Sequence, residues 1–210
     1  MVRVKICGFT ARKDIENALA LGIKIIGVNF YAGSPRHVPQ AKAKDLLAGL
    51  PEGITVIGVF VDPDEKNLLE TVSALNLSGV QLHGEESKAF IEKVREKLPG
   101  KIIIKSIRVK DSGMLSRSME TYTPDFFLLD SYNKKSKGGT GKVIDYSLLN
   151  GITLPWNRIF LAGGITPCNA AEVLKKFKPY GIDVASGVEV SPGKKDRKKM
   201  RLLIENIKNG

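Results

Sequence analysis

Short apolar runs alternate with segments of helical periodicity along the whole chain, and this alternation most strongly limits the fold. The unit is about 26 residues long and recurs eight times with no linker between halves. Strands that alternate with helices pair in parallel through right-handed crossovers. Eight units can close into a barrel, whereas an open doubly wound sheet usually has fewer strands in 210 residues. We therefore predict an α/β fold, a (β/α)8 TIM barrel, with residues 1–210 as a single domain.

Local patterns predict where the strands and helices begin. The strands are apolar runs bounded by turn residues. Helices should begin at Thr10, Asp62 and Thr166, because a side-chain oxygen precedes a helical pattern at each position. Proline follows Asp62 and Thr166, which suits a first helical turn. A short helix is expected near Asp145. The predicted strands are 2–7, 24–30, 55–61, 79–83, 101–107, 125–130, 158–162 and 181–185.

Composition is typical of a globular protein of the cytoplasm. The chain is 42% hydrophobic, and no apolar run approaches the roughly 18 residues needed to cross a bilayer. The N-terminus has a strand pattern and lacks the features of a signal peptide. Cys7 and Cys168 are far apart, so reduced thiols are expected. His37 and His83 also stand apart, and no Cys and His cluster has the spacing of a metal site.

The net charge of +11 comes from 33 Lys and Arg against 22 Asp and Glu. Such a surface attracts anions, including nucleic acids and phosphorylated metabolites. A nucleic-acid surface should interleave basic residues with stacking aromatics. Aromatic residues make up only 7% of the chain, and they do not accompany the basic clusters at 134–142 and 194–201. We interpret most of the charge as solvated helix faces and expect no nucleic-acid or membrane partner.

Two small-residue turns follow the last two predicted strands. Gly163 and Gly164 end the seventh strand, and Ser186 and Gly187 follow the eighth. Glycine lets a backbone approach an anion closely, so that N–H groups can point at it. Barrel enzymes frequently build a phosphate site after strands seven and eight. We predict that these four residues bind one phosphate group; two tight turns that bind nothing would give the same pattern.

The other strand ends carry reactive or polar side chains, and barrel active sites form at the C-terminal ends of the strands. Cys7, His83 and Asp130 end strands, and Arg36 lies in the loop after the second strand. Each has an alternative role. Cys7 could be a small buried hydrophobe, and Asp130 could cap a turn. Arg36 could pair with a surface carboxylate, and His83 could be a hydrogen-bonded structural residue.

A further glycine-rich segment, Gly138-Gly-Thr-Gly141, follows the sixth strand. It is not a Walker motif, because the Gly-Lys-Ser/Thr ending is missing. A flexible lid and a second anion-binding nest both remain open for it.

The strand-end residues belong to motifs that occur in a characteristic order. They are Lys5-Ile-Cys-Gly8, Phe30-Tyr31, Ser34-Pro-Arg36, Gly58-Val-Phe-Val61, Val80-Gln-Leu-His-Gly84, Leu128-Leu-Asp130, Gly138-Gly-Thr-Gly141, Leu161-Ala-Gly-Gly164, Asp183-Val-Ala-Ser-Gly-Val-Glu189 and Pro192-Gly-Lys-Lys-Asp196. In this order and spacing the chain resembles phosphoribosylanthranilate isomerase over nearly its whole length. Single motifs are weak signals, but the set is specific.

The resemblance implies an isomerase of tryptophan biosynthesis. It would convert N-(5-phospho-β-D-ribosyl)anthranilate to 1-(2-carboxyphenylamino)-1-deoxy-D-ribulose 5-phosphate by an Amadori rearrangement without a cofactor. The resemblance makes Cys7 the general base and Asp130 the general acid. It assigns the anthranilate carboxylate to Arg36 and the phosphate to the two glycine turns. Three further residues are predicted to bind substrate: Gln81, His83 and Asp183.

This chemistry sets requirements on the two catalytic groups. Opening the aminofuranose needs a proton on the ring oxygen, so Asp130 must carry a proton when it acts. Removing the C2 proton needs a base, so Cys7 must become a thiolate, and nearby cations or helix termini should lower its pKa. The iminium formed on ring opening acidifies the C2 proton, which explains why neither a metal nor a cofactor is needed.

Some residues depart from the family pattern, and other functions stay open. Asn29 stands where an apolar residue is usual, Phe9 where an aliphatic one is commoner, and Ala185 where Ser is frequent. A related histidine-pathway isomerase should have a carboxylate in place of Cys7. Indole-glycerol-phosphate synthase usually needs catalytic Lys and Glu at several strand ends, and Lys105 alone is weak support for it. A basic nucleic-acid-binding protein is the remaining alternative, and a monomer and a homodimer are both compatible with the sequence.

Overall fold

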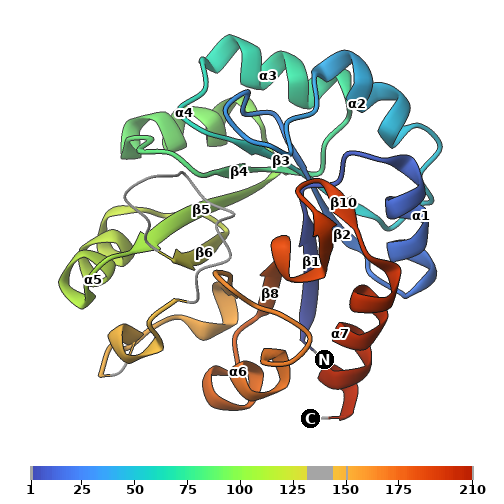
Figure 1. Ribbon diagram of the computed structural model, residues 1–210. Helices are drawn as coiled ribbons and strands as arrows, with labels where there is room; N and C mark the ends of the chain where they lie inside the picture. The colour runs from blue at the N-terminus through green and yellow to red at the C-terminus, as the bar shows by residue number, and fades with distance from the viewer. Residues whose placement is uncertain (1, 132–143, 150, 210) are drawn as a thin grey trace.

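The computed structural model describes residues 2–131, 144–149 and 151–209, and its strands confirm the (β/α)8 barrel (Figure 1). Eight strands lie side by side in sequence order, and the first pairs with the last in parallel. Lys5 faces Asp183 across this closing pair. The strands are β1 (Arg3–Cys7), β2 (Ile25–Asn29), β3 (Thr55–Phe60), β4 (Gly79–Leu82), β5 (Ile102–Val109), β6 (Phe126–Ser131), β7 (Ile159–Leu161) and β8 (Gly181–Val184).

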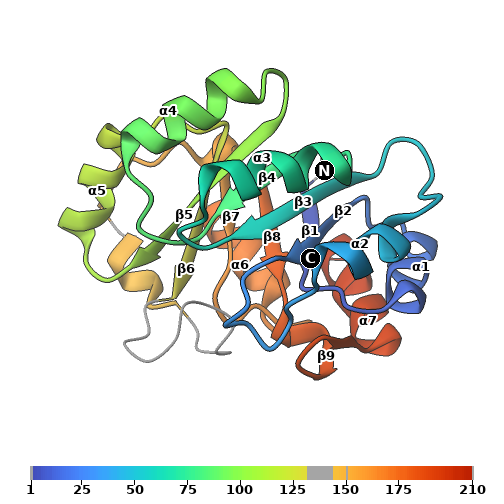
Figure 2. The same cartoon turned by 90° about the horizontal axis from the view of Figure 1, so that it is seen from above.

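Helices surround the strands on the outside of the barrel, as the view from above shows (Figure 2). The C-terminal helix α7 packs against both α6 and α1. This contact brings the two ends of the chain to the same side of the barrel (Figure 1). The α-helices are α1 (Arg12–Ala20), α2 (Gln40–Leu47), α3 (Glu65–Ala74), α4 (Lys88–Lys97), α5 (Ser112–Thr121), α6 (Ala170–Phe177) and α7 (Arg197–Asn209).

Two of the predicted helix starts are wrong by one or two residues. The N-cap of α1 is Ala11, and the Thr10 hydroxyl instead donates to the Gly193 carbonyl at 2.8 Å. The N-cap of α3 is Asp64, whose carboxylate accepts from the backbone N–H of Asn67. Asp62 has a φ of 45° and belongs to the preceding turn. Asp62 Oδ1 accepts from the backbone N–H of Glu85. In both cases a contact made outside the helix holds the residue that the local pattern selects.

The start of α6 is also later than predicted. Its N-cap is Asn169, and the Asn169 side-chain oxygen accepts from the backbone N–H of Thr166 at 2.8 Å. This bond keeps Thr166 in a turn before the helix. Cys168 lies in the same turn and is exposed, so it precedes α6 and does not belong to its first turn.

Two connections carry elements other than the usual helix. The short helix expected near Asp145 is the 3-10 helix η1 (Tyr146–Leu149). Gly138–Gly141 lies outside the described residues. After β8 the chain forms a 3-10 turn, η3 (Ser186–Val188), and then an antiparallel hairpin of β9 (Glu189–Ser191) and β10 (Lys194–Lys195). The sequence patterns did not predict this hairpin, which precedes α7.

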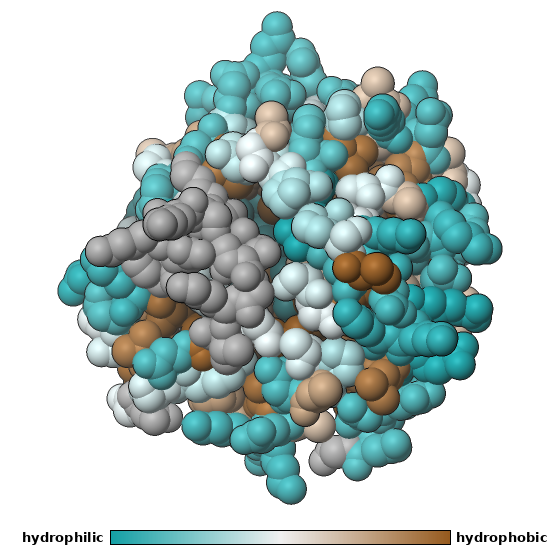
Figure 3. Space-filling model, viewed as in Figure 1, coloured by the Kyte–Doolittle hydropathy of each residue, from teal (hydrophilic) through white to brown (hydrophobic). Residues whose placement is uncertain are grey.

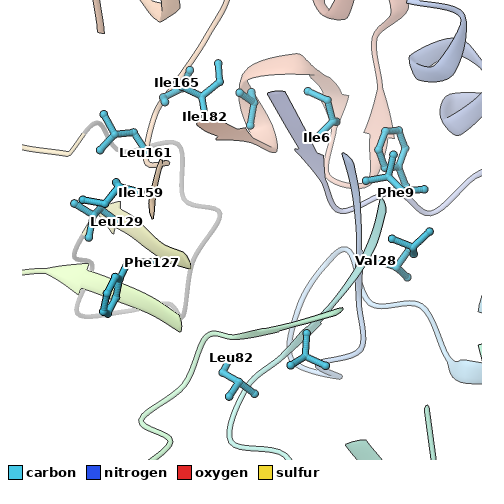
Figure 4. Packing of buried hydrophobic residues seen from close by; sticks show 14 of the residues in the cluster. Ile6, Phe9, Val28, Leu82, Phe127, Leu129, Ile159, Leu161, Ile165 and Ile182 are labelled. Carbon is cyan, nitrogen blue, oxygen red and sulfur yellow. The ribbon is translucent and has the colours of Figure 1, made fainter. Parts of the chain in front are cut away.

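Alternate residues of each strand face different apolar environments, because side chains on a strand alternate between its two faces. The larger cluster fills the layer between strands and helices, and Figure 4 shows residues of it, such as Ile6, Leu129 and Ile182, around the strands. A smaller cluster fills the barrel interior below the site: Ile57, Ile104, Leu128, Phe160 and Ala162. The interior is therefore packed at one end, and the polar residues lie at the other.

The surface is largely polar. Figure 3 shows a mostly hydrophilic face, with apolar residues in small separate patches. Among the large apolar side chains in the described ranges, Val190 and Leu202 are exposed, at 63% and 45%. In residues 2–131, 144–149 and 151–209, no helix is both long and apolar enough to cross a membrane.

Candidate active site

A pocket opens at the C-terminal ends of the strands, where the barrel geometry directs the strand-end side chains. Nine of the ten residues predicted for the site line it, and Gly187 is the exception. The predicted residues in its lining are Cys7, Arg36, Gln81, His83, Asp130, Gly163, Gly164, Asp183 and Ser186. The sequence-based expectation that these side chains converge on one mouth is therefore met for all but one of them.

Cys7 is the last residue of β1 and points into the pocket. Gly27 of β2 makes room for it, because a Cβ at Gly27 would lie 2.7 Å from the Cys7 sulfur. Only 9% of Cys7 is exposed. Gly8 follows with a φ of 81°, and a Cβ there would lie 2.4 Å from Cδ of Arg36. The Cys-Gly pair thus lets the thiol and the Arg36 stem occupy neighbouring space.

The electrostatic surroundings of Cys7 differ from the sequence-based expectation. Burial raises the pKa of the Cys7 thiol above its ordinary value, and the nearby Asp183 carboxylate raises it further. Lys5 and Lys195 act in the opposite direction but do not outweigh burial. The sequence-based prediction that the pKa of Cys7 is lowered is therefore wrong, because the pKa is raised. The cations that the expectation requires are present, yet desolvation of the thiolate is the larger effect.

Lys5 was not predicted as a site residue, although it lies directly beneath Cys7. Its ammonium group is fully buried, donates to Asp183 Oδ1 at 2.9 Å and interacts electrostatically with the Cys7 thiol. Burial lowers the pKa of Lys5, but Asp183 and Cys7 outweigh it, so the net pKa is raised. The signal was available, because a side-chain period of two places Lys5 on the same face of the strand as Cys7.

Asp130 lies across the pocket at the end of β6. Its Oδ1 accepts from the backbone N–H of Ser131 at 2.7 Å, and its Oδ2 lies 3.4 Å from Nε2 of His83. The Gln81 amide nitrogen lies 2.9 Å from Nδ1 of His83. With the amide as donor, His83 carries its proton on Nε2, on the side of Asp130. Gln81 thus orients the His83 ring, and the buried Nε2 of His83 faces Asp130 Oδ2 without a hydrogen-bond partner among the described residues.

The turn after β7 has a backbone conformation that depends on its two glycines. Gly163 and Gly164 both have positive φ, at 77° and 70°, a conformation that favours glycine. Within the described part of the chain, the backbone N–H groups of these two residues donate no hydrogen bond. A Cβ on Gly163 would lie 2.8 Å from the Ser131 nitrogen and 3.2 Å from Asp130 Oδ1. The absent side chain therefore brings this turn against the end of β6.

The turn after β8 contributes in two ways. Ser186 lines the pocket, whereas Gly187 lies behind it. A Cβ on Gly187 would lie 1.9 Å from the Ile165 carbonyl oxygen and 3.1 Å from Thr166 Cα. The absence of a side chain at Gly187 therefore allows the turns after β7 and β8 to touch. Gly187 sets the distance between these turns and does not itself line the pocket.

Arg36 is only 6% exposed. The sequence left open a pair with a surface carboxylate, but the carboxylate that pairs with Arg36 is buried. Its Nε and Nη2 donate to the two carboxylate oxygens of Glu189, at 2.9 and 2.6 Å. This hydrogen bonding raises the pKa of Arg36 above its already high value. Glu189 and its second partner Lys195 do not line the pocket. Sequence reasoning assigned neither of them a role in the site.

The departures from the family pattern have simple structural consequences. Asn29 lines the pocket and orders its own loop, donating to Ser34 Oγ and accepting from the Tyr31 N–H. Phe9 is fully buried in the layer outside the strands. The Lys105 ammonium group forms an ion pair with Glu86 at 2.6 Å. Leu82, which pairs with Lys105 on the neighbouring strand, packs in the layer between strands and helices, so the Lys105 side chain also points outward from the barrel. Lys105 therefore does not reach the pocket and lends no support to an indole-glycerol-phosphate synthase.

Comparison with known proteins supplies the decisive observation. A family model described as N-(5'-phosphoribosyl)anthranilate (PRA) isomerase matches residues 4–206. The chain belongs to the N-(5'-phosphoribosyl)anthranilate isomerase family. Proteins of that name from Microcystis aeruginosa and Pelobacter propionicus are 38% and 39% identical to it over 209 and 208 residues. These alignments cover 98% and 99% of the chain and 97% and 96% of the relatives.

Solved structures of this family have the same fold over the full chain. The phosphoribosylanthranilate isomerase of Thermotoga maritima superposes with a TM-score of 0.87 at 31% identity, with 100% of both chains covered. The enzyme from Thermus thermophilus gives 0.86 at 31% identity, with 99% of both chains covered. A phosphoribosylanthranilate isomerase in complex with reduced 1-(o-carboxyphenylamino)-1-deoxyribulose 5-phosphate gives 0.84 at 31% identity and full coverage.

Proposed function

We propose that this chain converts N-(5-phospho-β-D-ribosyl)anthranilate to 1-(2-carboxyphenylamino)-1-deoxy-D-ribulose 5-phosphate, a cofactor-free step of tryptophan biosynthesis. One observation carries the proposal. One pocket is lined by a thiol, a carboxyl group, a guanidinium group and a glycine turn: Cys7, Asp130, Arg36 and Gly163–Gly164. The N–H groups of this turn donate no hydrogen bond to any residue that the structure describes. Family membership supports the same activity.

In the proposed reaction Asp130 is the general acid and Cys7 the general base. Asp130 protonates the ring oxygen as the C1–O bond breaks, and the electron pair of the substrate nitrogen forms the iminium. Cys7 then removes the C2 proton, and the C2–H electrons neutralise the iminium to give the enol-amine, which tautomerises to the ketone. A positioned acid or base typically contributes about 10²–10⁴-fold to such a step.

The environment of Cys7 limits when it can act as a base. In the free site its thiol stays protonated, since burial raises its pKa. Two buried cations, Lys5 and Lys195, already favour the thiolate. The iminium formed on ring opening adds a third positive charge next to the C2 proton. The base would thus form in the presence of the ring-opened substrate, which limits side reactions of a free thiolate.

The anchors hold the substrate between the two catalytic groups. We assign the phosphate to the N–H groups of Gly163 and Gly164 with Ser186, and the anthranilate carboxylate to Arg36. The Arg36 edge that faces away from Glu189, with Nη1 and the second Nη2 proton, can bind that carboxylate with two parallel hydrogen bonds. Binding at both ends converts affinity into orientation.

The remaining proposed substrate residues act close to these groups. His83 and Gln81 would bind hydroxyl groups of the ribose while holding Asp130 in place. Asp183 would act mainly through its ion pair with Lys5. A location in the cytoplasm, a single domain over residues 1–210, and a monomeric or dimeric state are compatible with this function and stay predictions.

The proposal is tested by turnover of phosphoribosylanthranilate by the purified chain. Substrate and product have the same mass, so the product is identified by NMR through its new C2 ketone. In deuterated water, the proton removed from C2 and returned at C1 should lead to deuterium in the product. Absence of the ketone signal, with a folded protein and fresh substrate, would refute the proposed activity.

A further inference from the structure

Arg36 belongs to a cluster of three buried charges, of which only Arg36 has a proposed role in substrate binding. Arg36, Glu189 and Lys195 are 6%, 6% and 4% exposed. Glu189 and Lys195 are carried on the β9–β10 hairpin and lie outside the pocket lining. Burying charged groups is costly unless they are paired and hydrogen-bonded. A cluster placed directly behind a substrate-binding residue therefore calls for a reason other than stability.

Glu189 fixes the orientation of the Arg36 guanidinium group. Its two oxygens accept from Nε and Nη2, which is the bidentate geometry of an arginine–carboxylate pair. Its Oε1 also accepts from the Gly193 N–H at 3.2 Å, so that the carboxylate is itself held. Within the described residues Nη1 of Arg36 makes no hydrogen bond. One edge of the guanidinium is thus held from behind, and the other is left for the pocket.

Lys195 ties this carboxylate to the strand ends that form the site. Its Nζ donates to Glu189 Oε1 at 2.6 Å and to the backbone carbonyl of Cys7 at 2.5 Å. It lies 3.4 Å from the Ala185 carbonyl as well. One ammonium group therefore connects Arg36, through Glu189, to the ends of β1 and β8. The carboxylate that holds Arg36 is thereby joined to the strand that carries Cys7.

The charges of the cluster also explain why a lysine accompanies the pair. Glu189 alone would neutralise Arg36, and a neutral pair would attract a substrate carboxylate weakly. Burial lowers the pKa of Lys195, and its ion pair with Glu189 opposes this effect. As an ammonium group, Lys195 brings the sum to one positive charge. Burial raises the pKa of Glu189, but Arg36 and Lys195 outweigh it, so its net pKa is lowered. Glu189 is therefore ionised at neutral pH, and the cluster keeps a net cation beside the pocket.

We propose that Glu189 and Lys195 are positioning residues for recognition of the substrate carboxylate, which they serve by orienting Arg36 and fixing it relative to Cys7. This inference rests on the proposed role of Arg36. It predicts that loss of Glu189 impairs binding of the carboxylate end of a ligand and leaves the phosphate end intact.

The test compares two stable ligands in Glu189→Gln. One is the reduced product analogue with its carboxyl group, and the other is the same compound without that group. The amide keeps the shape of the side chain but cannot accept from both guanidinium nitrogens. We expect Kd for the carboxylated ligand to rise at least tenfold, while Kd for the carboxyl-free ligand changes less than twofold. Glu189→Asp, which keeps the charge, should restore part of the difference.

Glu86→Gln is the matched control. Glu86 is also 6% exposed and also accepts from a buried lysine, Lys105, at 2.6 Å. Its variant should lose stability in the same way but keep the parent ratio of the two Kd values. If Glu189→Gln is too unstable to purify, Lys195→Gln takes its place. The preference for the carboxylated ligand over the carboxyl-free one should fall in that variant too.

The outcomes separate the inference from the function on which it rests. Equal losses for both ligands in Glu189→Gln, with the parent still favouring the carboxylated one, overturn the inference and leave the role of Arg36 intact. A parent protein that does not favour the carboxylated ligand overturns both. A selective loss in Glu189→Gln that is absent from Glu86→Gln supports the inference.

Discussion

Replacing Gly187 with alanine should weaken phosphate binding although Gly187 does not line the pocket. Its Cβ would lie 1.9 Å from the Ile165 carbonyl oxygen. The two turns after β7 and β8 would therefore have to move apart by at least about 1 Å, because Cβ atoms do not approach other heavy atoms within 3.0 Å. The backbone at Ile165 directly follows Gly163 and Gly164, so the displacement reaches the N–H groups assigned to the phosphate.

The size of the effect follows from the bonds at risk. A hydrogen bond to a charged group contributes about 1.5–3 kcal/mol, and each 1.4 kcal/mol corresponds to about tenfold in affinity. Loss of one such bond therefore predicts a rise in KM of roughly 10-fold to 150-fold. A misplacement of about 1 Å can also reduce the catalytic rate by about 10²-fold.

The assay measures KM for the substrate, Kd for inorganic phosphate, and the free energy of unfolding. Gly79→Ala is the control, because a Cβ there would lie 2.3 Å from the Ile102 carbonyl oxygen at the opposite end of the barrel. Both variants should be less stable than the parent, but only Gly187→Ala should lose phosphate affinity. Unchanged phosphate binding in a destabilised Gly187→Ala would refute the phosphate cradle.

Three further predictions follow from the same structure. Arg36→Lys should reduce the preference for a carboxylated ligand over its carboxyl-free counterpart by about tenfold or more, because an ammonium group cannot form two parallel bonds; an unchanged ratio of Kd values contradicts the role of Arg36. Iodoacetamide at pH 7 should modify Cys168, which is exposed, before Cys7, whose pKa burial raises. Peptide mass spectrometry should show Cys7 reacting faster as the pH rises, and faster modification of Cys7 at pH 7 would contradict this account. Burial raises the pKa of Tyr146 to about 12, whereas an unfolded tyrosine ionises near pH 10. The stability of the parent relative to Tyr146→Phe should therefore fall as pH rises from about 10 to 12 in urea titrations, and a constant difference would count against it.

The barrel could be predicted from the sequence because its signals are local. Strand and helix periodicities and turn residues recur eight times, and eight parallel units leave few ways to close a sheet. The strand-end residues could be placed together for the same reason, since parallel strands direct their C-terminal ends to one face. Cys7 and Asp130, which are 123 positions apart in the printed numbering, converge without any knowledge of side-chain contacts.

The supporting contacts could not be predicted, because they depend on packing between distant segments. Arg36 and Glu189 are 153 residues apart, and no local pattern relates them. The β9–β10 hairpin was missed because its strands are short and Val190 is exposed. Its residues therefore do not show the alternation of apolar and polar side chains that predicts a strand. The pKa of Cys7 was predicted in the wrong direction for a related reason. Cations can be guessed from sequence, but the depth of burial that opposes them cannot.

The central claim is that Cys7 and Asp130 are the base and the acid of this isomerisation. Measuring kcat in two single variants, Cys7→Ser and Asp130→Asn, tests this claim most directly. Serine keeps nearly the same shape but is too weak an acid to ionise near neutral pH, and asparagine keeps the outline of Asp130 but cannot deliver a proton. We expect kcat to fall by about 10²-fold or more in each variant. Kd for the reduced product analogue should stay within about threefold of the parent value, because the anchoring bonds are untouched. Full turnover by pure, folded Cys7→Ser would contradict the mechanism.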